Sequence, residues 1–117
     1  MRRNSTKIKA KKMKENPSCY VCQNSTFYIL ELHHVVPIRS GGADCETNTE
    51  LLCPNCHAFL HFMISDKASD YIPEDETISE TISRYTNNPI SKYRMSKLIN
   101  RWVVGLEEKI NNGGETQ

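Results

Sequence analysis

The apolar and polar residues of this chain follow distinct patterns along its length. Residues 25–36 (STFYILELHHVV) are rich in β-branched and aromatic side chains, and they predict one or two strands that end at Pro37. Residues 39–50 (RSGGADCETNTE) are polar and predict a loop, in which two adjacent glycines supply turn conformations that other residues resist. Residues 55–64 (NCHAFLHFMI) predict a helix. The middle of the chain is therefore expected to combine strands and a helix.

Two further helices are predicted in the last part of the chain. Residues 73–86 (PEDETISETISRYT) predict a short helix with acidic residues near its start, where the helix dipole favours them. A longer helix is expected from Ser91 to Ile110, because Asn111-Asn112-Gly113-Gly114 favours a helix end. Its apolar residues follow three- and four-residue spacing: Met95, Leu98, Ile99, Trp102, Val103, Leu106 and Ile110. Such a stripe is most often core, and the alternative is a dimer or partner interface.

The length and composition predict one small domain in a reducing compartment. With 117 residues, the chain can bury a single small core, and domains of this size often need a covalent or metal staple. No secretory signal is recognisable and no apolar run approaches the length of a membrane span, so we expect no membrane association and a cytoplasmic location. In that compartment the five cysteines are more often metal ligands than disulfides.

A net charge of +1 hides a basic segment at the start of the chain. Residues 1–16 form an arm that is expected to be helical near its end and to stop at Asn16-Pro17. Basic arms of this kind contact nucleic acid, and the alternative is a solvated tail. The arm carries Arg2, Arg3, Lys7, Lys9, Lys11, Lys12 and Lys14.

Two Cys-x-x-Cys pairs predict a zinc site. Cys19 and Cys22 form the first pair, and Cys53 and Cys56 form the second. Each pair can hold two thiolates on one tight turn, and two pairs complete a closed tetrahedral shell. Four sulfurs leave no open coordination position, so this zinc is expected to be structural. The fifth cysteine, Cys45, is expected to be a spectator thiol.

The four histidines suggest a second, open metal site. His57 and His61 are four residues apart on the predicted helix and therefore share one face. A third imidazole would complete a site with positions free for water and substrate. His33 and His34 are adjacent on a predicted strand, where successive side chains point to opposite faces. One of them can therefore face the helix while the other projects elsewhere.

Over residues 17–62 the chain resembles the zinc-bracketed members of the HNH endonuclease family. The resemblance rests on Cys-x-x-Cys, His33-His34-x-x-Pro37, Gly41-Gly42, Asn48, Cys53-Pro-Asn-Cys56-His57 and His61. It implies a small α+β fold, in which a ββα-metal module is stapled by the four-cysteine zinc site and followed by C-terminal helices. The corresponding division of the chain is a basic arm at 1–16, a nuclease core at 17–63 and a helical extension at 64–117.

The resemblance also implies a role for each residue of the motif. His33, His57 and His61 hold one divalent cation such as Mg²⁺, Mn²⁺ or Ni²⁺, His34 acts as the catalytic base, and Asn48 orients His34. Many relatives carry an acidic residue in place of His33, and an all-histidine site accepts transition metals more readily than a carboxylate-rich one. Relatives commonly have leucine where Thr49 stands here, which is expected to cost some packing beneath the loop.

These expectations define one main hypothesis and two alternatives. The main hypothesis is a metal-dependent endonuclease of bacterial or phage origin that hydrolyses DNA and leaves 5′-phosphate and 3′-hydroxyl ends, with Arg39 holding a flanking phosphate or simply exposed. One alternative is a zinc-stapled nucleic-acid-binding module without catalysis. The other is a nuclease subunit of a homodimer or larger complex, assembled through the C-terminal helix.

Overall fold

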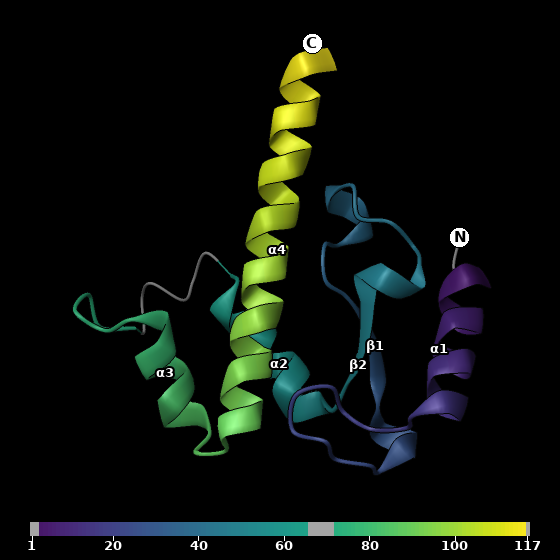
Figure 1. Cartoon of the computed structure of the whole chain (residues 1–117), viewed down its shortest axis with the longest axis vertical. Coiled ribbons are helices and arrows are strands. Elements are labelled where there is room, and N and C mark those ends of the chain that lie inside the picture. Colours follow the sequence, from purple (N-terminus) through teal and green to yellow (C-terminus); the bar gives the residue numbers. More distant parts are fainter. Residues whose placement is uncertain (1–2, 66–71, 117) are drawn as a thin grey trace.

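The computed structural model describes residues 3–65 and 72–116, and within these residues it contains one two-stranded sheet and four α-helices (Figure 1). The strands are β1 (Glu31–His34) and β2 (Thr49–Leu52), and the helices are α1 (Arg3–Glu15), α2 (Pro54–Met63), α3 (Ile78–Tyr85) and α4 (Pro89–Thr116). The small α+β class predicted from the sequence is therefore confirmed.

The sheet is an antiparallel pair in which His33 lies opposite Glu50 and His34 lies opposite Thr49. The strand region is shorter than the sequence predicted, because Phe27–Ile29 forms a 3₁₀ turn and only four residues pair in each strand. The loop between the strands contains two further 3₁₀ turns, Ile38–Ser40 and Glu46–Asn48. The predicted loop is therefore compact and locally ordered.

Helix α2 follows β2 with a single intervening residue, Cys53, and its position agrees with the predicted helix. The Sγ atom of Cys53 accepts a hydrogen bond from the backbone N–H of Cys56 at 3.5 Å. Pro54 occupies the first turn, where the missing N–H costs nothing and the fixed φ favours the helix. The cysteine pair therefore also caps the helix that carries His57 and His61.

The basic arm forms a packed helix, so the interpretation as a solvated tail is wrong. Helix α1 spans nearly the whole arm and contacts β1. Ile8 is buried, and Met13 packs against the core. Lys11 forms an ion pair with Glu46 at 2.9 Å, which joins the helix to the loop between the strands. Of the predicted basic residues, Arg2 lies outside the described residues.

Helix α3 begins at a capping box, in which Thr77 accepts a hydrogen bond from the Glu80 N–H and the Glu80 side chain accepts one from the Thr77 N–H. Helix α4 begins two residues before the predicted start and continues to Thr116, through the Asn111-Asn112-Gly113-Gly114 segment that was expected to end it. Each glycine costs a helix only about 1 kcal/mol relative to alanine, so such a segment weakens a helix without forbidding it. Within the described residues, no helix is both long and apolar enough to cross a membrane.

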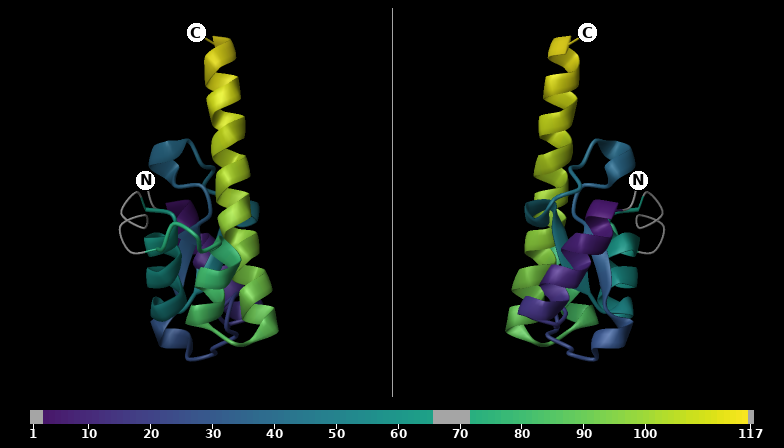
Figure 2. Two further views of the ribbon diagram at one scale, coloured as in Figure 1. Left: turned by 90° about the vertical axis from the view of Figure 1, so that its left-hand side faces the viewer. Right: turned by 90° about the vertical axis from the view of Figure 1, so that its right-hand side faces the viewer.

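The first half of α4 belongs to the core of this chain, and its second half extends beyond the other elements (Figures 1 and 2). Met95, Leu98 and Ile99 are buried among residues of β2 and α2. Val103 and Val104, further along, are 40% and 41% exposed. The reading of this part of the stripe as core is therefore confirmed for Leu98 and Ile99, because other elements of the same chain bury them.

This arrangement predicts the response to truncation of the stripe on α4. Leu98→Ala should lower the free energy of unfolding of the zinc-loaded protein by about 2–5 kcal/mol, because it leaves a cavity at a fully buried position. Val104→Ala, at an exposed position of the same helix, should change it by less than about 0.5 kcal/mol. Urea unfolding at two protein concentrations measures both effects. Equal effects of the two variants, or a stability that rises with concentration, would place the stripe between chains.

Candidate active site

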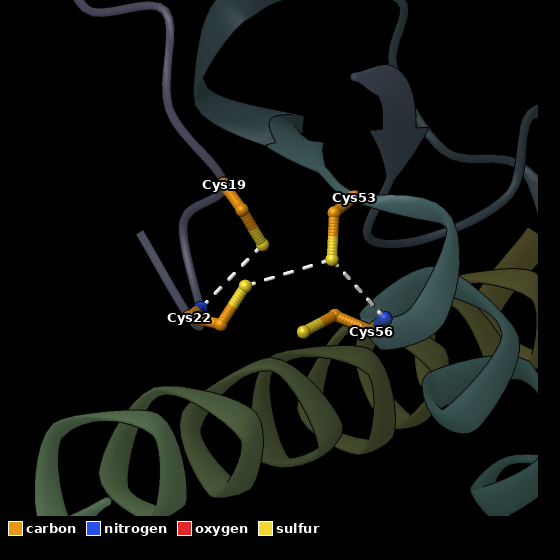
Figure 3. Close-up of side chains that lie close together, drawn as sticks. All are labelled: Cys19, Cys22, Cys53 and Cys56. Atoms are coloured by element: carbon orange, nitrogen blue, oxygen red, sulfur yellow. Dashed lines mark hydrogen bonds between the residues drawn. The ribbon is translucent and has the colours of Figure 1, made fainter. Parts of the chain in front are cut away.

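Four cysteine side chains converge between the segment after α1 and the start of α2 (Figure 3). Their sulfur atoms all lie within 4.8 Å of one another. In both pairs the N–H of the second cysteine donates to the sulfur of the first at 3.5 Å, so the two turns have matching geometry. Gln23, directly after the first pair, has a left-handed φ of 64°, and its N–H closes the turn onto the Cys19 carbonyl at 2.9 Å.

The donor set of this cluster fits zinc. Burial raises the pKa of Cys22 to about 11, whereas a hydrogen bond with Cys56 lowers the pKa of Cys19 to about 4. Thiols this close cannot all ionise unless a cation compensates their charge, and four thiolates in a closed cluster are a typical structural zinc site. Cys45 lies outside the cluster, on the loop between the strands, and contacts Thr47. Its predicted status as a spectator agrees with this position.

The helical extension contacts the cysteine cluster directly. The Tyr85 hydroxyl of α3 donates to Cys56 Sγ at 3.2 Å, and the Tyr85 ring stacks on Phe59 of α2. The Ser91 hydroxyl, near the start of α4, donates to the Val21 carbonyl between the first two cysteines at 3.1 Å. The sequence did not indicate these contacts, because they join positions far apart in the chain.

Three histidine side chains converge between β1 and α2. The ligand nitrogens of His33, His57 and His61 lie within 4.8 Å of one another, and the Nε2 atoms of His57 and His61 are 3.0 Å apart. His33 is buried, and burial together with the neighbouring imidazoles lowers its pKa to about 3. A neutral imidazole keeps the lone pair that a metal ion needs. The three side chains therefore suit a divalent cation, with room for water or substrate as further ligands.

Glu31 orients one of these histidines, and the sequence analysis did not identify it. Its carboxylate contacts His57 Nδ1 at 2.7 Å, which leaves His57 Nε2 directed toward the other imidazoles. Metal-binding histidines commonly donate their second ring N–H to a carboxylate in this way. Glu31 and His33 are two residues apart on β1 and so share the face that meets α2. That spacing is the one sequence signal that could have indicated Glu31.

His34 points away from the histidine cluster. Its Nε2 atom lies 2.9 Å from Asp44 Oδ1 on the loop between the strands, and its side chain is 13% exposed. A cavity of about 420 Å³ is nevertheless shared by His34, the three clustered histidines and Arg39. Strand alternation thus separates the partners of His33 and His34 while both side chains border one cavity.

Asn48 binds backbone groups and not the His34 side chain. Its Oδ1 accepts from the Val36 N–H at 3.0 Å, and its Nδ2 donates to the carbonyls of Val36 at 3.0 Å and Ala43 at 2.7 Å. Asn48 therefore does not make the hydrogen bond to His34 that the resemblance implies. It stabilises the loop that follows β1 instead. Gly42 makes this loop possible, because a Cβ there would lie 1.8 Å from the Val36 carbonyl oxygen.

Thr49, where relatives commonly carry leucine, is fully buried, so the expected loss of packing is not observed. Its hydroxyl lies 3.2 Å from the Cys45 carbonyl and 3.1 Å from the Glu46 carbonyl, to which it donates. The substitution therefore exchanges apolar contact for hydrogen bonds that hold the same loop.

The predicted nucleic-acid contacts fall into two groups around the cavity. Arg39 borders the cavity itself. Helix α1 lies beside the loop that holds His34, because Ser5 in its first turn donates to Asp44 Oδ1 at 2.8 Å. Four lysines of α1 are exposed, Lys7, Lys9, Lys11 and Lys14, and Lys12 is half-buried. Of the exposed ones, Lys11 forms the ion pair with Glu46. Arg3 begins this helix.

The cysteine cluster generates a prediction with a matched control. Cys53→Ser should remove a zinc ligand and unfold the protein, because the binding energy of a structural zinc is folding energy. Cys45→Ser should retain one zinc per chain and the helical signal of the wild type, because Cys45 lies outside the cluster. Elemental analysis and circular dichroism measure both properties. A well-folded Cys53→Ser protein with full zinc content would contradict the four-cysteine site.

Comparison with known proteins shows what this site is similar to. Residues 19–62 match the model of the HNH endonuclease family, and they include both cysteine pairs and all four histidines. A segment of the chain is also similar to a type IV methyl-directed restriction enzyme, EcoKMcrA of Escherichia coli strain K12. The two are 49% identical over 51 residues, which cover 38% of this chain and 18% of that enzyme. The chain thus corresponds to less than a fifth of this relative. What the comparisons show is thus a match of residues 19–62, less than half of the chain, to the HNH endonuclease family.

Proposed function

We propose that the chain is a metal-dependent endonuclease that hydrolyses DNA phosphodiester bonds and leaves 5′-phosphate and 3′-hydroxyl ends. The observation that carries the proposal is the division of the histidines around one cavity: three converge within 4.8 Å, and the fourth lies beside them with a carboxylate partner. A binding module would need neither the convergence nor the fourth histidine. The family match supports nuclease activity in general.

In the proposed mechanism His33, His57 and His61 would hold the cation, which when bound supplies charge stabilisation for the phosphate and the departing oxygen. His34 accepts a proton from a water molecule in the cavity, and the resulting hydroxide attacks phosphorus. The bond from phosphorus to the 3′ oxygen breaks, and that oxygen takes up a proton from solvent. Arg39, at the border of the same cavity, holds a neighbouring phosphate. Cleavage of each phosphodiester bond thus consumes one water molecule.

The choice of DNA rests on charge and on the relative. The exposed lysines of α1 lie on an element that contacts the loop beside His34, so a strand in the cavity can continue along this helix. The similar enzyme is a restriction enzyme by name, but the matched segment is only 18% of it. We therefore propose cleavage for this chain and not the methyl-directed selection of that enzyme. Assembly through the C-terminal helix, near the exposed Val103 and Val104, and a cytoplasmic location stay predictions.

Two histidine variants test the proposed roles. His34→Ala should lower the rate of plasmid cleavage by about a hundredfold or more, because general-base catalysis contributes that much, while Ni²⁺ and DNA binding persist. His57→Ala should abolish cleavage and also weaken Ni²⁺ binding, because it removes a ligand, while the zinc of the cysteine cluster stays in place. Gel assays with Mg²⁺, Mn²⁺ or Ni²⁺ and calorimetry with Ni²⁺ measure these properties. If the wild type binds DNA but cleaves with none of the three ions, the non-catalytic zinc module is the correct reading. Cleavage by His34→Ala at the wild-type rate would exclude His34 as the base.

The contribution of α1 to DNA binding is best tested by point substitutions, because deleting the helix would expose the core around Ile8. Replacing Lys7, Lys9 and Lys14 by glutamine should weaken DNA binding and lower the slope of log affinity against log salt by about one unit for each lost phosphate contact. Lys92→Gln, on α4, provides the control and should leave the slope unchanged. Fluorescence anisotropy over a range of salt concentrations gives the slopes. An unchanged slope in the triple variant would remove α1 from the DNA-binding surface.

A further inference from the structure

The loop residue Asp44 makes a contact that neither the family resemblance nor the motif spacing indicated. Its Oδ1 atom lies 2.9 Å from His34 Nε2, and both side chains are largely shielded from solvent, at 19% and 13% exposed. The ordinary pKa of an aspartate lies well below neutral, and the contacts with His34 and Ser5 lower the pKa of Asp44 further, so its carboxyl group is ionised at neutral pH. An ionised carboxylate can only accept hydrogen bonds. The proton of the His34–Asp44 hydrogen bond therefore belongs to His34 Nε2.

This assignment determines the state of the other ring nitrogen. A neutral imidazole carries one N–H, so a proton on Nε2 leaves the lone pair of Nδ1 free. Nδ1 is the atom that can then accept a proton from water. With the proton on Nδ1 instead, Nε2 would be the acceptor and would face a carboxylate, which has no proton to donate. The carboxylate thus favours the one tautomer that is useful to a base.

Asp44 is itself held from two sides. Ser5 of α1 donates to the same Oδ1 atom at 2.8 Å, and α1 is anchored by buried Ile8. On the chain side, Asn48 donates to the carbonyl of Ala43, the preceding residue, at 2.7 Å. The carboxylate therefore has little freedom to turn away from the imidazole. If Asp44 served only to join α1 to the loop, its contact with Ser5 would suffice. The contact of His34 Nε2 with the same Oδ1 atom indicates a second role.

We infer that Asp44 is the positioning residue of the proposed general base: it holds the His34 imidazole with its proton on Nε2 and its Nδ1 open to water, and Ser5 of α1 holds Asp44. The inference rests on the proposed role of His34 in DNA hydrolysis. When Nδ1 takes the proton of the attacking water, the imidazolium keeps its Nε2–H bond to Asp44, and the carboxylate compensates the new charge. No proton needs to reach Asp44.

The test combines a spectroscopic and a kinetic measurement on the zinc-loaded protein with Mg²⁺. Long-range ¹H–¹⁵N correlation spectra at pH 8, where ordinary imidazoles are neutral, report the tautomer of each histidine. The wild type should show His34 with its proton on Nε2. Asp44→Ala should shift His34 toward a mixture of tautomers and lower kcat for DNA cleavage by about tenfold to a hundredfold, with KM unchanged. Asp44→Asn retains an acceptor oxygen without the charge, so it should keep the tautomer and recover part of kcat.

Ser5→Ala separates positioning from tethering, because it removes the contact with α1 and leaves the carboxylate. Its His34 tautomer should be unchanged, because the carboxylate remains, and its kcat should fall less than that of Asp44→Ala. Equal losses of kcat in Ser5→Ala and Asp44→Ala, with the tautomer unaffected in both, would overturn the inference and leave a structural tether. A wild-type His34 protonated on Nδ1 would also overturn it, and Asp44→Asn gives the same readouts should Asp44→Ala fold poorly. If the wild type cleaves no DNA but His34 keeps its proton on Nε2 in an Asp44-dependent manner, the nuclease proposal fails and the hold of Asp44 on His34 stands.

Discussion

The alternation of side chains along β1 is the constraint on which the site depends. Four residues of this strand supply two residues to each face: Glu31 and His33 meet α2, whereas His34 meets Asp44 and the loop next to α1. A shift of the pairing by one residue would exchange these faces and would bring His34 to the cluster of His57 and His61. The position of the strand against its partner therefore decides which histidine can bind a cation and which can bind a water molecule.

Two devices hold the strand in this register. At one end, the cysteine cluster joins the segment before β1 to the start of α2, and Tyr85 of α3 extends this support into the helical extension. At the other end, Asn48 bonds both backbone groups of Val36 and closes the loop that returns to β2. A hairpin of only two short strands is marginally stable by itself. The cysteine cluster, Asn48 and the packing of α4 together supply the stability that the sheet lacks.

Local chemistry was predictable from the sequence, and long-range contacts were not. Spacings of three and four residues predict each cysteine pair and the pair of His57 and His61, because they place side chains together within one turn or one helix face. Asp44 carries no such signal, and Glu31 has only its two-residue spacing from His33, because their histidine partners lie 10 and 26 residues away and are brought close only by the fold. Composition suggested a solvated tail as an alternative for α1, and one buried residue, Ile8, was too weak a pattern to exclude it. The helix end predicted from Asn111-Asn112-Gly113-Gly114 was wrong, because residues that disfavour a helix do not forbid one.

The central claim is that one chain holds two metal sites of different kinds, with His33 in one and His34 in neither. Crystals of the zinc-containing protein loaded with one equivalent of Ni²⁺ test it through anomalous difference maps recorded on both sides of the zinc and nickel absorption edges. The account predicts a zinc peak among Cys19, Cys22, Cys53 and Cys56, and a nickel peak among His33, His57 and His61, with His34 still bonded to Asp44. A nickel ion ligated by His34, or no peak at the histidines, would contradict it.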